Sequence, residues 1–179
     1  MKTLLALAIV IATPAFATCP PVPDTIAEES QILSKVRVAP NERAARLLSN
    51  DLWALWTLAP DDHAQELLDR GMQARGSYDF DSAIQAFDRL VDYCPDYAEG
   101  YNQRAFVNFL RENYDQALTD LDEAIARRPH HVAAIAGKAL TLIGLKRDVE
   151  AQRVLREALA LNPWLSERRF LTEPDATDL

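Results

Sequence analysis

Histidine is the side chain that most often performs acid–base chemistry near neutral pH, and this chain has three. His63, His130 and His131 each follow a proline within three residues, so we expect all of them in exposed turns at helix starts. None has an evident serine or cysteine partner that it could activate as a nucleophile. Adjacent histidines on a turn seldom point at one ion, and no third metal ligand is evident. The sequence therefore predicts no catalytic residues, no metal site and no cofactor.

Carboxylates and glycines add no stronger case for catalysis. Asp120 and Asp122 are two residues apart on a predicted helix, so their side chains diverge and should lie on a solvated face. The chain has 5 glycines and no glycine-rich phosphate-binding loop. We predict that the protein is not an enzyme.

The chain has 2 cysteines, Cys19 and Cys94. In an oxidising compartment they could pair, which would close a loop of about 75 residues and stabilise the fold by ~4 kcal/mol. The alternative is that Cys94 is a small apolar residue at a helix end and Cys19 is a free thiol. Two cysteines so far apart in sequence form neither a CxxC redox centre nor a zinc site.

Residues 1–17 have the order of a secretory signal peptide. A positive charge at Lys2 is followed by an apolar run, and the segment ends in Ala15-Phe16-Ala17. The run is shorter than the ~20 apolar residues that a membrane-spanning helix needs, which disfavours an uncleaved anchor. The pattern predicts Sec-type export, cleavage after Ala17 and a periplasmic location in a bacterium.

The negative net charge of the chain limits the classes of partner that it can bind. Cleavage would remove only Lys2 and leave 18 basic against 27 acidic residues, a formal charge of −9 compared with −8 for the whole chain. An acidic protein binds nucleic acid and anionic membranes poorly, because both are negatively charged. We expect neither nucleic-acid binding nor membrane insertion of the mature chain.

Five columns of similar residues recur every 34 positions through the middle of the chain. They are Arg70, Arg104 and Lys138; Gly71, Ala105 and Ala139; Ala83, Ala117 and Ala151; Phe87, Leu121 and Leu155; and Pro95, Pro129 and Pro163. The columns define units 64–97, 98–131 and 132–165. Each unit predicts two amphipathic helices, with small residues at their crossing and a proline ending the second helix. Since one hairpin cannot bury its apolar face alone, the units should stack.

Two helix starts carry the pattern of a capping box. Asp96 with Glu99 predicts the start of a helix at 98–111, and Asn113 with Gln116 predicts the start of the next helix.

At these columns the chain resembles the tetratricopeptide repeat family over residues 64–165. The resemblance implies an all-α fold, a right-handed superhelical solenoid of three helix hairpins with N- and C-terminal capping helices. Residues 18–63 are expected to form the N-terminal cap, with 41–58 as a degenerate half-repeat. Residues 166–179 are expected to form a short capping helix and a mobile tail.

The resemblance also implies a concave face that binds a partner. Carried over by position, its central stripe consists of Leu68, Met72, Asn102, Phe106, Phe109, Leu140 and Ile143. Many family members grip a partner's terminal carboxylate with Lys, Asn and Arg. This chain has instead Leu68, Met72, Gln103, Ala133 and Gly137, so we expect no such clamp. The stripe is either open to a partner or filled by residues 18–60, which carry Trp53 and Trp56.

These observations favour a protein–protein interaction module of the bacterial periplasm. In this hypothesis an adaptor or scaffold holds a protein or peptide on its concave face. The alternative is a chaperone-like assembly factor for exported or envelope proteins, including those of cytochrome biogenesis.

Overall fold

The computed structural model describes residues 18–172, and these form eight α-helices and one short 3-10 helix. The predicted signal peptide and the last seven residues of the predicted tail lie outside this range. The helices are α1 (Ile26–Arg37), α2 (Glu42–Trp56), α3 (Asp62–Gly76), α4 (Phe80–Tyr93), α5 (Ala98–Leu110), α6 (Tyr114–Arg127), α7 (Val132–Gly144), α8 (Asp148–Leu161) and the 3-10 helix η1 (Ser166–Phe170).

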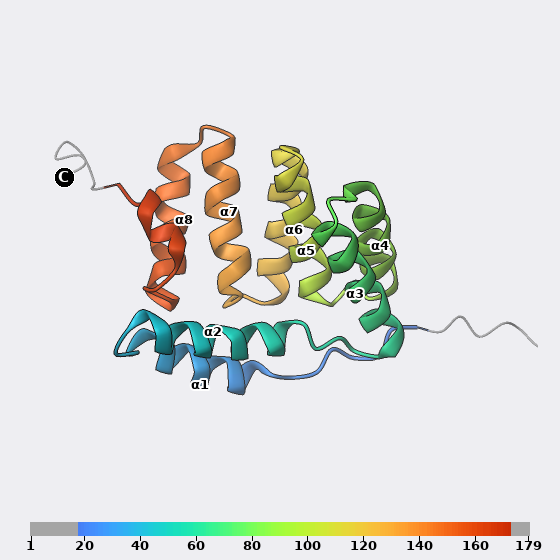
Figure 1. The fold of residues 1–179 in the computed structure, drawn as a ribbon, viewed down its shortest axis with the longest axis horizontal. Coiled ribbons are helices and arrows are strands. Elements are labelled where there is room, and N and C mark those ends of the chain that lie inside the picture. The colour runs from blue at the N-terminus through green and yellow to red at the C-terminus, as the bar shows by residue number, and fades with distance from the viewer. Residues whose placement is uncertain (1–17, 173–179) are drawn as a thin grey trace, which may run out of the picture.

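Helices α3 to α8 form three antiparallel hairpins that stack side by side (Figure 1). The second helices begin at Phe80, Tyr114 and Asp148, so the structure repeats with the same period of 34 residues as the sequence. The described residues contain no strand. This confirms the predicted all-α solenoid of three helix hairpins.

The small residues of the repeat lie where the two helices of a hairpin approach each other. A Cβ atom added to Gly71 would come within 2.3 Å of the Phe87 ring, so this position admits only glycine unless the ring moves. The alanines of the two small columns are fully buried: Ala83, Ala105, Ala117, Ala139 and Ala151. Close backbone approach therefore sets the geometry of each hairpin.

The first helix of every hairpin ends in the same hydrogen-bonded turn. In the first repeat, the Asp79 N–H donates to Ala74 O and the Tyr78 N–H donates to Arg75 O, each at 3.0 Å, which is a Schellman motif. Tyr78, Glu112 and Lys146 stand at the left-handed position with φ of 61°, 61° and 62°. Glycine usually occupies this position, and none of these three residues is a glycine, so the turns have no glycine signal in the sequence.

The basic column also has a structural role. Arg104 Nη2 lies 2.6 Å from Asp120 Oδ1, and Arg104 Nη1 lies 2.8 Å from Asp88 Oδ1, so one guanidinium joins α5 to α6 and α4. The hydrogen bonds that Arg104 donates to Asp120 raise the pKa of Arg104. The prediction of a solvated Asp120 is wrong, since this carboxylate is buried, whereas Asp122 is exposed as expected.

Helices α1 and α2 pair with each other and lie across the edge of the solenoid where α5 and α7 begin and α8 ends (Figure 1). Buried side chains of α1 and α2 pack there against Val132 of α7 and against Trp164 and Leu165 after α8. The α1–α2 hairpin therefore braces the solenoid edge. It does not stack on α3 as the expected half-repeat would, and Trp53 does not take the buried place that Phe87 has in its own repeat.

Both ends of the described chain are held against the repeats. A disulfide joins Cys19 to Cys94 at the end of α4. After α8, η1 runs back along this helix, and Gln152 bonds the backbone of Phe170 and Thr172 at 2.9 and 2.8 Å. Within the described range, every helix is too short or too polar to cross a bilayer.

Candidate functional site

A hollow of about 290 Å³ opens on the concave face of the solenoid. Helices α5 and α7 form most of its wall, α2, α3 and α6 contribute one residue each, and the segment after α8 closes one side. The lining residues are Trp53, Arg75, Asn102, Gln103, Ala105, Phe106, Phe109, Leu121, Ala133, Ala136, Gly137, Leu140, Thr141, Leu165 and Glu167. The lining is thus mainly apolar, and two of its side chains are charged.

The structure brings together four of the seven residues predicted for the stripe. Asn102, Phe106, Phe109 and Leu140 all line the hollow. Phe106 is 45 % exposed there.

The other three stripe residues lie elsewhere. Leu68 is fully buried in the core between α3 and α4, so its prediction as a partner-binding residue is wrong. Met72 packs against this same core, and Ile143 packs against the core of the third repeat. In α3 the failure has a physical reason, because Leu68 packs against side chains of α4 and near Ala59 of the chain entering from α2, in the same buried cluster.

Residues outside the repeats complete the wall, and the sequence pattern did not reveal them. Trp53 of α2 reaches the hollow with 38 % of its surface exposed, and Leu165 and Glu167 reach it from the segment after α8. Trp56, one turn further along α2, is instead buried. The N-terminal segment therefore borders the hollow and leaves it open.

Arg75 and Gln103 form a polar contact at one end of the hollow. The Arg75 guanidinium donates to Gln103 Oε1 and lies 4.8 Å from the centroid of the Phe106 ring. Burial lowers the pKa of Arg75, and the negative charge of Glu99 partly opposes this shift. Gln103 in turn donates to Glu99, so it separates the arginine from the buried carboxylate.

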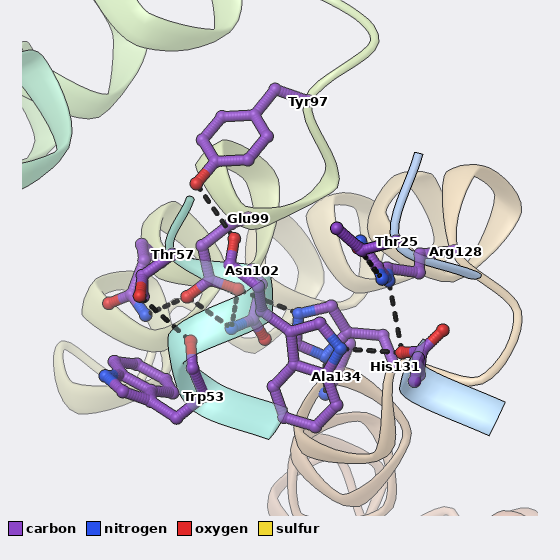
Figure 2. A network of polar contacts seen from close by, with 12 residues as sticks. Thr25, Trp53, Thr57, Tyr97, Glu99, Asn102, Arg128, His131 and Ala134 are labelled. Carbon is purple, nitrogen blue, oxygen red and sulfur yellow. Dashed lines mark hydrogen bonds and ion pairs between the residues drawn. The ribbon is translucent and has the colours of Figure 1, made fainter. Parts of the chain in front are cut away.

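Glu99 and His131 form a buried pair behind the hollow (Figure 2). Glu99 Oε2 lies 2.8 Å from His131 Nε2, and the Ala134 N–H donates to His131 Nδ1 at 3.3 Å. Because Nδ1 accepts this bond, the ring proton must lie on Nε2, which donates to Glu99. His131 thus caps the start of α7, and the prediction that it is a solvent-exposed turn residue is wrong. His63 and His130 are exposed.

The expected capping boxes are absent from these helix starts. Glu99 points into the core, and α5 begins without a side-chain cap. Asn113 likewise makes no side-chain cap at the start of α6. Glu99, which the sequence pattern assigned to a capping box, instead lies at the centre of a buried polar network.

This network fastens the α1–α2 hairpin to the repeats. The Trp56 ring stacks on His131 with centroids 4.1 Å apart, and its Nε1–H donates to Glu29 Oε1 at 2.6 Å. Arg128 donates to the same Glu29 oxygen at 3.1 Å and to Thr25 Oγ1 at 2.6 Å (Figure 2). These contacts fix α2, and with it Trp53, against the solenoid.

The Tyr97 hydroxyl adds a further link to α2. It donates to the Trp56 carbonyl oxygen at 2.8 Å, and its burial raises the pKa of the phenol. The side chains of His131 and Glu99 are 0 % and 1 % exposed. Among residues 18–172 no three His, Cys, Asp or Glu side chains are grouped to hold a metal ion. The polar network positions helices.

The family model described as tetratricopeptide repeat matches residues 109–164. A TPR repeat-containing protein of Rhizobium etli is 33% identical over 67 residues, which cover 37% of this chain and 33% of that protein. The predicted resemblance is therefore confirmed. The repeated helix hairpins of this chain are of the tetratricopeptide repeat (TPR) type.

Two further matches describe the TPR region. The Hsp70/Hsp90 co-chaperone cns1 of Schizosaccharomyces pombe is 30% identical over 108 residues, covering 58% of this chain and 30% of that protein. The matched part is thus about a third of each of these two relatives. The first TPR of Spaghetti (RPAP3), solved bound to the HSP90 peptide SRMEEVD, has a TM-score of 0.58 at 22% identity, covering 59% of this chain and 84% of that one. At 22% identity, this structural similarity shows a shared fold alone.

TPR domains generally mediate protein–protein interaction, and this chain has such a domain. The TPR repeats here form a scaffold whose concave hollow is bordered by a non-repeat brace. Its features are an apolar wall, an exposed phenylalanine and a fixed arginine.

Proposed function

We propose that this protein binds a segment of another protein in the concave hollow and acts as an adaptor or scaffold. The observation that carries the proposal is the exposed ring of Phe106, which faces an apolar space bordered by Phe109 and Leu140. Exposed apolar surface in a concave site favours an apolar side chain of a partner, because binding removes both from water. The partner-binding residues of the proposal are Asn102, Phe106, Phe109 and Leu140, together with Trp53.

The proposal includes a periplasmic location in a bacterium. Its support is the signal-like order of residues 1–17 and the disulfide between Cys19 and Cys94, since disulfides persist mainly in oxidising compartments. Fractionation of cells expressing the native chain, followed by sequencing of the mature N-terminus, tests this part. Recovery in the cytoplasm with reduced cysteines would overturn it.

The binding proposal is tested by capture of partners with the purified chain and two variants. Phe106→Glu places a charge in the hollow, and Val149→Glu places the same charge at an 86 % exposed site on α8, outside the hollow. We expect Phe106→Glu to lose the captured partner while its helical circular dichroism is unchanged, and Val149→Glu to capture like the wild type. Equal capture by all three proteins would refute the hollow as the binding site.

A second candidate function is that of a chaperone-like assembly factor for exported proteins. The similarity to a co-chaperone over 108 residues favours it. However, the positions where many family members grip a terminal carboxylate hold Leu68, Met72, Gln103, Ala133 and Gly137 in this chain, and the last three of these line the hollow. The lifetime of the complex discriminates the two functions: an adaptor forms a stable stoichiometric complex, whereas an assembly factor binds an unfolded client transiently and releases it on folding.

A further inference from the structure

Two side chains of the hollow's lining are charged, and they come from opposite ends of the row of repeats. Arg75 lies in the last turn of α3 in the first repeat, and Glu167 lies in η1, after the third repeat. Among residues 18–172, neither forms an ion pair. Helices α5 and α7, which carry Phe106 and Leu140, lie between them.

Arg75 is held in place and is not neutralised. It is partly buried, its guanidinium bonds Gln103, and it lies over the Phe106 ring. The nearest buried carboxylate, Glu99, is on the far side of Gln103 and already bonds His131, Asn102 and Gln103. A cation that is partly removed from water and has no direct anionic partner gains when a ligand brings one.

Glu167 is in the complementary situation. It is partly buried, and the polar contact of its carboxylate is with the Ser166 hydroxyl at 3.1 Å. The neighbouring cations are engaged elsewhere, because Arg168 pairs with Glu42 at 3.2 Å and Arg169 lies over the Phe170 ring. The hollow therefore has a positive end at α3, an apolar centre and a negative end at η1.

Resting on the proposed function, we propose that the hollow selects a partner segment by its charge order: an acidic residue toward Arg75, a large apolar residue against Phe106 and Leu140, and a basic residue toward Glu167. Electrostatic complementarity across an interface fixes register and suppresses wrong partners. The hollow offers one cation to a ligand, and the whole chain carries a formal charge of −8, so a segment with several acids is disfavoured.

The test is a selection of random 12-residue peptides displayed on phage, with the full chain immobilised. The informative peptides are those that the wild type enriches and Phe106→Glu does not, and we expect them to share the acid–apolar–base order. Arg75→Glu should replace the acid of this motif with a base, and Glu167→Lys should replace the base with an acid. Arg89→Glu makes the same charge change as Arg75→Glu at an exposed site on α4, outside the hollow, and should leave the motif unchanged.

One synthetic peptide from the selection then measures how much Arg75 contributes to binding. We expect Arg75→Gln to weaken its binding about tenfold, the usual value of one charge-assisted contact, as measured by fluorescence anisotropy. Replacing the peptide's acid with its amide should cost the same in the wild type and nothing further in Arg75→Gln. Thermal unfolding of the variant controls for its fold.

The outcomes separate this inference from the proposed function. If peptides depend on Phe106 but their charges are unaffected by Arg75→Glu and Glu167→Lys, the hollow binds partners and the charge order is wrong. If no enriched peptide depends on Phe106, both proposals are overturned.

Discussion

Replacing His131 with alanine removes two hydrogen bonds from a buried site, in addition to the stacking contact with Trp56. The first is the cap of α7, in which His131 Nδ1 accepts from the Ala134 N–H at 3.3 Å, and loss of a cap costs about 1 kcal/mol. The second is the bond to Glu99 at 2.8 Å, and its loss leaves a buried carboxylate with one donor fewer at a cost of about 1–3 kcal/mol. We expect the free energy of unfolding in urea to fall by about 2–4 kcal/mol in total.

A second variant, His131→Asn, separates the contribution of the helix cap from that of the bond to Glu99. Asparagine is a good helix cap but is too short to replace the imidazole at Glu99, so His131→Asn should recover about 1 kcal/mol of what His131→Ala loses. The fluorescence of Trp56 should change in both variants, because its ring stacks on His131 in the native protein. A loss below about 0.5 kcal/mol in His131→Ala would refute the assignment of this histidine to a buried structural pair.

Three other predictions concern stability. Glu112→Gly should raise the free energy of unfolding by about 0.5–1 kcal/mol, because φ at this position is 61° and glycine adopts it without strain; a lower urea midpoint would contradict this. Cys19→Ser should lose up to ~4 kcal/mol through loss of the disulfide to Cys94, and reduction of the wild type should give the same loss; an unchanged midpoint after reduction would exclude a stabilising link. The hydrogen bond that the Ala64 N–H donates to Asp61 lowers the pKa of this carboxyl below its unfolded value of 3.8. The ionised carboxylate therefore stabilises the fold above pH 3.8, and this stabilisation is lost as pH falls through the folded pKa. Asp61→Asn should flatten the dependence of the free energy of unfolding on pH below pH 3.8.

The repeats were predictable because the residues that define each hairpin lie close together in the sequence and the same pattern occurs three times. Gly71, Ala83 and Phe87 recur in register 34 residues on, and close helix crossing requires small residues at such positions. A pattern of this kind determines which face of each helix is buried, so the hairpins and their order follow from the sequence. Four of the seven stripe residues on the concave face were predicted correctly for the same reason. The prediction for Leu68 was wrong because its burial by α4 does not follow from its position in the repeat alone.

The brace and its network were not predictable from local pattern. The bonds from Arg128 to Glu29 and to Thr25 join residues 99 and 103 positions apart, and no periodicity relates them. His131 follows a proline at a turn, which is ordinarily an exposed place, and it is buried here because α2 lies across that turn with Trp56 above the ring. The contribution of Trp53 to the hollow depends on this same placement.

The central claim is that the concave hollow holds a segment of a partner protein, and contact in living cells tests it most directly. Benzoylphenylalanine can replace Phe106 with little change of shape, and the same photoreactive residue at position 149 serves as the control outside the hollow. After irradiation of intact cells, we expect crosslinking from position 106 to one defined protein and no such product from position 149. The same products from both positions, or none from position 106, would contradict the account.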